Sequence, residues 1–354
     1  MSRVPAPLPD DLGTSFTVRS ALAAGVSARR LRHQQFATPF RGVRMLAARS
    51  VPSGHVERFD ESPRALETRV LTSEIRELAR AFAPVAPRGS FYCRVTAAVL
   101  WGLPVPLRLL RGAVTRTRQA GAGIPTPVIE AAVLAPNRAS RSTGVRGYQY
   151  SPQSVSIRTL DGLRLTSPAT TWAQLADVLT IDELVELGDA IVRIPRRRGM
   201  LRGTEADALG SIAQLAAAAA VPYRRHAEKL RRALAFVRVG SSSPGETRTR
   251  LCIVRAGMPE PTLDFDVIAS DGTAIGFTEL AYPEYRLLIE YEGDHHRTDR
   301  EQWQRDVDKH AACVDEGWQV LRLTSKHLYP STEPAVDRVF TALVRGGWRR
   351  EGCR

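Results

Sequence analysis

A chain of 354 residues is too long for one ordinary hydrophobic core, so two or three domains are expected. Hydrophobic residues make up 43% and charged residues 25%, which is typical of a globular, soluble protein and excludes a disordered chain. The net charge of +13 favours a polyanionic partner, most often nucleic acid. The alternative explanation is a GC-rich genome, which raises the arginine and alanine content everywhere.

The cysteines and the apolar segments favour a reducing, cytoplasmic location. No CxxC or other metal-ligand spacing occurs among the four cysteines, which read as scattered thiols. The first residues, MSRVPAPLPDDLG, contain no apolar run, so no signal peptide is expected. The most apolar segment, 209–221, is mostly alanine and too short to span a bilayer. We therefore expect no membrane association.

Residues 1–50 are predicted to form a small basic unit. Thr17 can cap a helix that runs to about Ala24, and Ser27 can cap a second helix over 28–34. Residues 40–46 alternate like a short strand, which completes the plan of a winged helix-turn-helix. The alternative is a small helical cap with a solvated basic face. The residues expected to face DNA are Arg29, Arg30, Arg32 and His33, with Arg41 and Arg44 on the wing.

Residues 51–200 are predicted to form an α+β middle domain after a polar linker. No catalytic constellation is found here, because histidine is absent between His55 and His226 and the acidic residues are scattered. Residues 201–239 form an Ala- and Arg-rich helical connector, whose basic run is either a solvated face or a contact with a phosphate backbone. The expected helices of the middle domain are 63–83, 92–104, 169–178 and 181–194, and its strands are 127–133, 146–150 and 154–158.

Residues 240–354 are predicted to form a C-terminal α/β domain. A helix from Glu246 to Ala256 precedes a strand over 263–269 and then a hairpin. A further helix over 300–316, a strand over 318–323 and a last helix over 334–344 follow. The helix over 300–316 is predicted from the helical spacing of Trp303, Val307, Ala311 and Val314.

The hairpin carries the most informative acidic residues of the chain. Its two runs, 277–282 and 287–292, are separated by four residues, which pairs Tyr282 with Leu287 and places Glu279 opposite Glu290. Glu290 and Glu292 are two residues apart and share a face of the strand. Like charges that face each other destabilise a sheet, so a cation is expected among the three carboxylates. A slip of one residue would move Glu279 to the other face.

Several motifs resemble known families. Residues 1–50 resemble the winged-helix antitoxin domain of the AbiEi type. The stretches VTAAVLWGLPVP and GLRLTSPATTWAQLADVLTIDELVELGDAIVR resemble the middle of actinobacterial proteins that carry this head and end in a nuclease-like domain. The order of C-terminal elements resembles PD-(D/E)XK nucleases, and most closely the branch of very-short-patch-repair endonucleases. The motifs behind this resemblance are SPGETRTR, TELAYPEYRLLIEYEGDHHR, EQWQRDVDKH and GWQVLRLTSKHL, within residues 240–345.

The resemblance implies a metal site for phosphodiester hydrolysis. The metal would be Mg²⁺ or Mn²⁺, held by Glu279 (where aspartate is usual), Glu290 and Glu292, the last at a position that often carries lysine. The further implied site residues are the helix acids Glu246 and Asp306, the motif histidine His296 with His295 beside it, and Arg297, Arg300 and Arg305 on flanking phosphates.

The sequence thus predicts a DNA-binding protein with a Mg²⁺-dependent endonuclease domain and no organic cofactor. An alternative is a non-catalytic DNA-binding regulator, or an antitoxin-like repressor, with a degenerate nuclease fold. The extra methylene of Glu279 motivates this alternative, because it shifts a ligand by about an ångström. A toxin–antitoxin partner protein is a third expectation.

Overall fold

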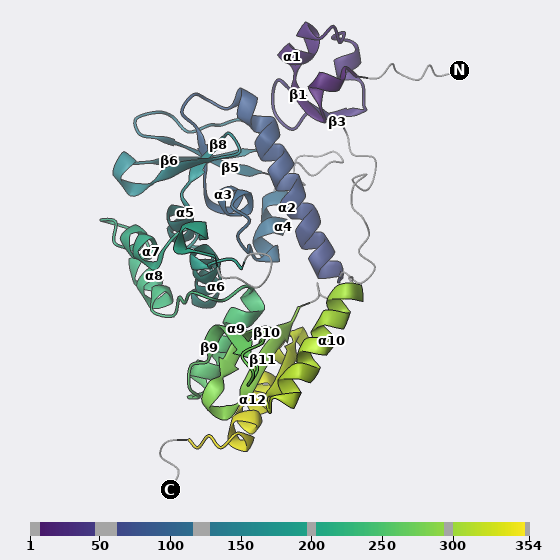
Figure 1. The fold of residues 1–354 in the computed structure, drawn as a ribbon. Coiled ribbons are helices and arrows are strands. Elements are labelled where there is room, and N and C mark those ends of the chain that lie inside the picture. Colours follow the sequence, from purple (N-terminus) through teal and green to yellow (C-terminus); the bar gives the residue numbers. More distant parts are fainter. Residues whose placement is uncertain (1–7, 47–61, 116–127, 197–202, 294–299, 351–354) are drawn as a thin grey trace. The chain divides into compact units, whose positions relative to one another are not determined.

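The computed structural model describes residues 8–46, 62–115, 128–196, 203–293 and 300–350. These residues form a mixed α+β structure with sheets of three, five and four strands (Figure 1). Contacts group them into two compact units, one of residues 8–46 and 66–167 and one of residues 62–65 and 168–350. In this division the helices after residue 167 belong to the same unit as the C-terminal sheet, whereas the sequence suggested a boundary near residue 200. No helix in the described ranges is long and apolar enough to cross a membrane.

The N-terminal sheet has the order β1-β3-β2, with β1 at Ser15–Thr17, β2 at Phe36–Ala37 and β3 at Val43–Leu46. Helix α1 spans Val18–Ala23, and the Thr17 hydroxyl accepts a hydrogen bond from the Ser20 N–H at 2.9 Å, which confirms the predicted cap.

The predicted second helix over 28–34 is wrong. The chain forms only a 3₁₀ turn, η2, at Arg30–Arg32, although Ser27 Oγ still accepts from the Arg30 N–H at 3.3 Å. The turn ends early because His33 is extended and the chain enters β2 three residues later. This places Leu31 and Phe36 together in the small buried core of this part.

The middle sheet has the order β6-β5-β4-β8-β7. Helices α2 (Pro63–Phe82) and α3 (Arg94–Leu100) contribute to the core on one of its faces, and α4 spans Leu107–Thr115. The strands are β4 at Phe91–Tyr92, β5 at Ile129–Leu134, β6 at Val145–Tyr150, β7 at Ile157–Leu160 and β8 at Leu163–Thr166.

The strand expected over 154–158 lies later in the chain, at β7. It pairs with β8 so that Leu160 faces Leu163, which leaves a two-residue loop of Asp161 and Gly162. Both loop residues have positive φ, 49° and 78°, as a type I′ hairpin turn requires. This Asp-Gly pair is the sequence signal that would have predicted β8.

Four helices open the second unit: α5 (Pro168–Gln174), α6 (Ile181–Val192), α7 (Ile212–Ala219) and α8 (Ala227–Leu234). The helical region expected over 204–237 is therefore interrupted. Pro222 cannot donate a backbone hydrogen bond, and Tyr223 and His226 take left-handed conformations with φ of 58° and 60°. The interruption turns the chain back, so that α8 packs against both α7 and α6.

Ion pairs join α6 to α9 (Pro244–Arg255). Asp189 and Arg250 are both 1% exposed and lie 2.8 Å apart. Asp189 also accepts hydrogen bonds from the Thr247 hydroxyl at 2.9 Å and the Arg238 N–H at 2.7 Å. Because all its partners are supplied by the fold, the buried charge is satisfied. The two outer ion pairs of this interface are Glu186–Arg248 at 2.8 Å and Asp182–Arg255 at 2.5 Å.

The C-terminal sheet has the order β12-β11-β10-β9. Strand β11 is parallel to β12 and antiparallel to β10. The pairing of Tyr282 with Leu287 confirms the predicted hairpin register and its four-residue loop. The elements are β9 at Thr262–Ile268, β10 at Ala274–Tyr282, β11 at Leu287–Glu292, α10 at Arg300–Asp315, β12 at Gln319–Thr324, α11 at Ser325–Leu328 and α12 at Glu333–Arg345.

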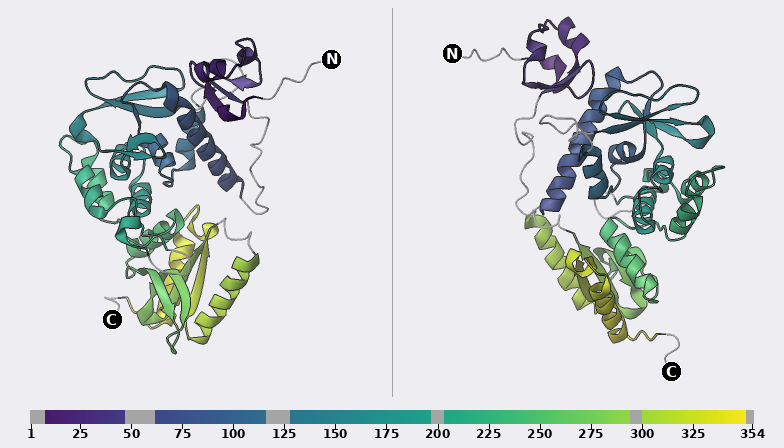
Figure 2. Two further views of the ribbon diagram at one scale, coloured as in Figure 1. Left: turned by 45° about the horizontal axis from the view of Figure 1, so that its top comes forward. Right: turned by 180° about the vertical axis from the view of Figure 1, so that it is seen from behind.

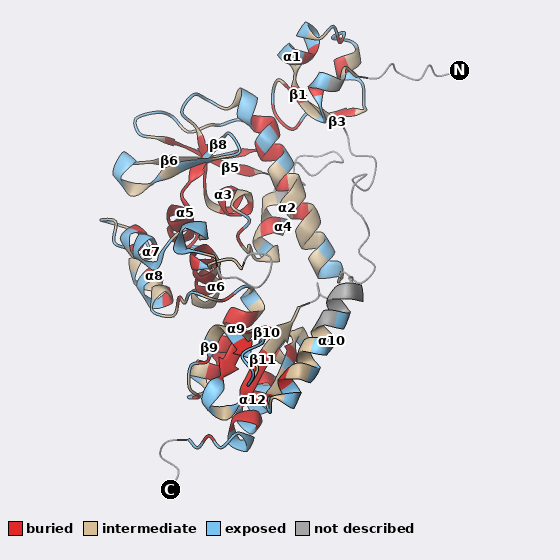
Figure 3. Ribbon diagram, viewed as in Figure 1, coloured by how far each residue is buried: buried red, intermediate tan, exposed pale blue. Residues whose placement is uncertain are grey.

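Helices cover the C-terminal sheet on both faces, as the two views of Figure 2 show. Residues of α9 and α12 form the larger core with one face, and Cys313 of α10 packs on the other with Ala281 and Leu288. The central strands β10 and β11 are buried over much of their length (Figure 3). Polar groups gather where the C-terminal end of β11 lies beside β10, near the start of α9.

Helix α10 has a different buried face from the one its apolar spacing indicates. Val307 and Val314 are 40% and 50% exposed, and Ala311 is exposed as well. Cys313 is buried instead, and Lys309, one turn earlier, approaches the sheet. The inward face follows from the small residues Cys313 and Ala281, which allow close packing.

Candidate functional site

Glu290 and Glu292 lie on one side of β11, as the sequence predicts. Arg322 of β12, which pairs with Glu290 in the parallel ladder, reaches both carboxylates. Its Nε lies 3.7 Å from Glu290 Oε2 and its Nη1 lies 3.2 Å from Glu292 Oε1. A single guanidinium can bridge both only because the two residues share a face.

Glu279 lies one residue beyond the paired Leu280 and Ile289, beside β11. Its Oε2 accepts a hydrogen bond from the Tyr291 N–H at 3.3 Å. Burial raises the pKa of Glu279 to about 8, and the nearby charges of Glu246 and Glu290 add to this rise, while Lys309 opposes it. The carboxyl group of Glu279 is therefore close enough to those of Glu246 and Glu290 for their charges to act on it.

Lys309 is a site residue that sequence reasoning missed. Its Nζ lies 2.5 Å from Glu290 Oε1 and 5.8 Å from the centre of the Phe277 ring. A side chain at Gly276 would crowd the lysine stem, with a Cβ only 3.2 Å from Lys309 Cδ. Lys309 is thus held over β10 with its ammonium group on the acidic cluster. The sequence carried no signal for it, because the apolar spacing of α10 indicated Val307 and Val314 as the inward face.

Glu246 joins the cluster from the first turn of α9. Its side chain is buried, and its Oε2 accepts from the Ser242 N–H at 2.6 Å. Ser243 caps the helix by accepting from the Glu246 N–H at 3.3 Å. Burial raises the pKa of Glu246 to about 7, which Asp264 favours and Arg193 opposes. Glu246 therefore takes part in the hydrogen bonds at the start of α9, and its charge also acts on Glu279.

Asp264 and Arg196 form a support beside this cluster that the sequence did not indicate. Asp264 has φ of 50°, an unusual value within a strand. Arg196 Nε lies 2.5 Å from Asp264 Oδ1, and Arg196 Nη1 lies 2.6 Å from Asp266 Oδ1. The guanidinium also stacks over Phe277 at 4.2 Å. These contacts hold β9 in the conformation that brings Asp264 toward Glu246.

The other site residues are not all within the described part of the chain. His295, His296 and Arg297 lie outside the described residues, as do the side chains of Arg300 and Arg305, whose backbone belongs to α10. Asp306 is half-buried on the same helix.

The donor set suits a hard cation only in part. Glu279 and Glu290 supply carboxylate oxygens, the ligands that Mg²⁺ prefers. Among the described residues, however, no three His, Cys, Asp or Glu side chains form a group placed to hold a metal ion. Glu290 and Glu292 are instead neutralised by Lys309 and Arg322. A metal would therefore have to compete with these two cations.

The N-terminal arginines divide into exposed and structural ones. Arg29, Arg32 and Arg41 are exposed, and Arg30 is half-buried. Arg44 Nε donates to the Leu31 carbonyl at 2.7 Å and its Nη1 donates to its neighbour's carbonyl at 2.9 Å. Arg44 therefore ties β3 to the η2 turn.

Comparison with known protein families, with characterised proteins and with solved structures finds no match to this chain.

Proposed function

We propose that this protein binds DNA and hydrolyses it with a Mg²⁺- or Mn²⁺-dependent endonuclease site of the PD-(D/E)XK type in residues 240–345. The observation that carries the proposal is the meeting of Glu246, Glu279 and Glu290 beside Lys309 at one end of the C-terminal sheet. Carboxyl groups with strongly raised pKa values cluster at functional sites more often than elsewhere. The basic chain around this acidic cluster supports a polyanionic substrate.

Glu279 and Glu290 would hold the metal ion. When bound, a divalent cation stabilises negative charge on phosphate oxygens and makes water a stronger nucleophile. The ammonium group of Lys309, freed from Glu290, would donate a hydrogen bond to a phosphate oxygen. Burial, together with the charges of Glu246 and Glu290, would keep Glu279 protonated until a cation arrives. Glu292 would orient water. His296, Arg297, Arg300 and Arg305 keep the roles expected from the resemblance.

The N-terminal part would bind DNA as a winged helix of the AbiEi type. Its exposed Arg29, Arg32 and Arg41 suit phosphate contacts. The short η2 turn replaces a full recognition helix, so we infer that this part contributes affinity more than base reading. In this proposal the partner is DNA, and the protein acts in the cytoplasm.

The test is plasmid nicking with Mg²⁺ or Mn²⁺. We expect cleavage by the wild type and at least about a hundredfold loss in Glu290→Gln, since the site loses a charged ligand. Glu284→Gln is the matched control, because Glu284 is exposed in the hairpin turn and outside the cluster. If the wild type cuts no DNA or RNA, or if both variants cut equally well, the catalytic proposal is lost.

The second candidate is a non-catalytic DNA-binding regulator or antitoxin-like repressor. The observation that favours it is the pairing of Glu290 and Glu292 with Lys309 and Arg322, which neutralises the cluster without metal. A mobility-shift assay on DNA from the gene's own upstream region discriminates. Sequence-specific binding that survives EDTA and Glu290→Gln, together with absent cleavage, favours the regulator. Co-purification of a neighbouring gene product would identify a toxin partner.

A further inference from the structure

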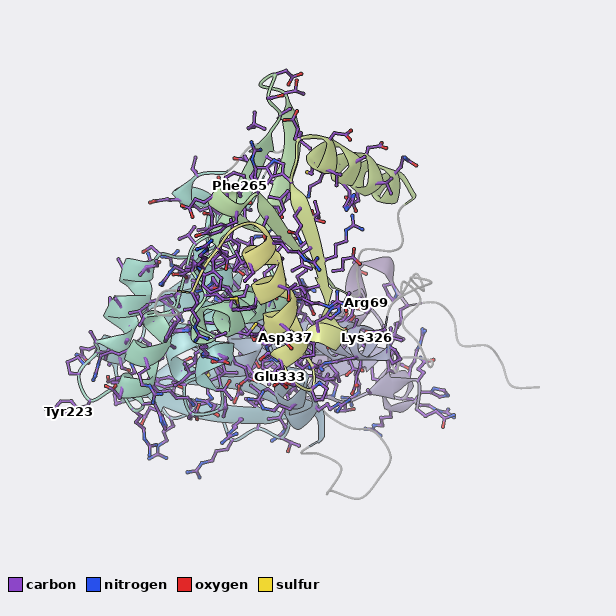
Figure 4. All side chains as sticks on the ribbon, turned by 90° about the horizontal axis from the view of Figure 1, so that it is seen from below. Arg69, Tyr223, Phe265, Lys326, Glu333 and Asp337 are labelled. Carbon is purple, nitrogen blue, oxygen red and sulfur yellow. The ribbon has the colours of Figure 1, made fainter. Side chains whose placement is uncertain are left out.

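The turn between α7 and α8, residues 221–226, presents an aromatic side chain to solvent. Tyr223 is fully exposed, with a relative accessibility of 103%, and Figure 4 shows it projecting from the protein. Its backbone has φ of 58°, and His226, three residues later, has φ of 60°. A left-handed conformation costs a non-glycine residue about 1–3 kcal/mol. Because the Tyr223 side chain is fully exposed, it offsets none of this cost by packing.

The same turn and the helix that follows are strongly basic. Between Pro222 and Leu234 the chain carries five lysine and arginine residues and one acid, Glu228. Glu228 is paired with Arg231, and Lys229 donates to the Ala176 carbonyl at 2.9 Å. Arg225, within the turn, and Arg232, on α8, are exposed. The surface therefore combines a free aromatic ring with solvent-facing guanidinium groups.

We propose that this surface, the α7–α8 turn with Arg225 and Arg232, binds a single-stranded segment of nucleic acid. Tyr223 stacks on an unpaired base, and the two arginines contact phosphates of the same strand. Stacking on an aromatic ring needs no particular base, because every base has a π-face. The inference rests on the proposed DNA-binding function and narrows its substrate class to strands with unpaired bases, while remaining independent of cleavage.

Charge and shape favour nucleic acid over a protein or a membrane. A protein interface typically buries a cluster of aromatic and apolar side chains at its centre. The turn offers one exposed ring followed along the chain by the exposed cations Arg225 and Arg232, which suits the bases and phosphates of a single strand. An anionic lipid surface would also attract the arginines, so vesicles form one arm of the test.

The test measures binding of the full chain to a fluorescent single-stranded oligonucleotide in EDTA by anisotropy. We expect Tyr223→Ala to weaken binding about five- to 150-fold, the range for losing one stacked base, with Tyr223→Phe close to the wild type. Arg225→Ala and Arg232→Ala should each lower the slope of log affinity against log salt by about 0.7. Arg158→Ala, an exposed arginine of β7, is the matched control and should change neither quantity.

Two outcomes would overturn the inference. One is Tyr223→Ala binding the oligonucleotide as tightly as the wild type, and the other is Tyr223→Ala losing affinity only for anionic phosphatidylserine vesicles. Glu284→Gln, outside both the acidic cluster and this surface, should bind the oligonucleotide normally, and EDTA prevents cleavage during the measurement. Failure of cleavage and failure of this binding site are therefore read in separate assays.

Discussion

Replacing Glu279 by glutamine should stabilise the fold at neutral pH. The pKa of Glu279 rises from 4.5 to about 8 on folding, so the wild type must take up a proton at this site to fold at pH 7. Each pKa unit corresponds to about 1.4 kcal/mol, so this uptake costs about 3 kcal/mol at pH 7 and about 5 kcal/mol above pH 8. Glutamine resembles the protonated acid and carries no such cost.

The sign of the effect follows from the direction of the shift. Because the folded state binds the proton more tightly, the wild type loses stability as pH rises from about 4.5 to about 8. Glu279→Gln should remove that part of the pH dependence, with equal stability near pH 4. At pH 7 a gain of about 3 kcal/mol corresponds to about 6–12 °C in melting temperature for a unit of this size.

Thermal and urea unfolding between pH 4 and pH 9, without divalent metal, measures this gain. Glu284→Gln is again the matched control, because its carboxylate is exposed and should leave stability unchanged within about 0.5 kcal/mol. A second arm adds Mg²⁺, which should stabilise the wild type more than Glu279→Gln. The reasoning is refuted if Glu279→Gln is less stable than the wild type at pH 7, or if both proteins keep the same pH dependence.

Three further predictions test the surroundings of the cluster. Lys309→Met should tighten Mn²⁺ binding several-fold by calorimetry, because it removes a competing cation, and should slow any cleavage; weaker Mn²⁺ binding would contradict the competition. Arg250→Met should cost about 3–5 kcal/mol in urea unfolding, because it leaves the buried Asp189 without its ion-pair partner. A loss below about 1 kcal/mol would contradict this. Gly245→Ala should cost about 1–3 kcal/mol or more, because its Cβ would overlap the Tyr291 ring. A smaller side chain at that position, in Tyr291→Leu, should recover part of the loss, and no recovery would show that the overlap with the ring is not the cause.

The hairpin was predictable because its signals are local. Two runs of strand length around Pro283 fix the loop at four residues, and that loop fixes the pair Tyr282↔Leu287. The shared face of Glu290 and Glu292 then follows from the period of a strand. An element whose apolar pattern, length and turn residues all indicate the same structure can be predicted without knowledge of its tertiary contacts.

The rest depended on packing between distant segments. Lys309 meets Glu290 because α10 turns Cys313 inward, whereas its apolar spacing indicated Val307 and Val314. The inward face of α10 rests on contacts with the sheet, which a single sequence does not display. The break at Tyr223, in contrast, had a visible signal in Pro222, which cannot continue a helix.

The ion pairs between α6 and α9 also limit which segments of this protein a gene fusion could join to another protein. A gene fusion that joined residues 240–350 to a different N-terminal segment would leave Arg250 buried without Asp189, and Arg248 without Glu186. An uncompensated buried charge costs several kcal/mol, so such a chimaera would fold poorly. The segment that could be transferred as one folding unit therefore begins before α6, near Pro168, and includes these helices together with the sheet.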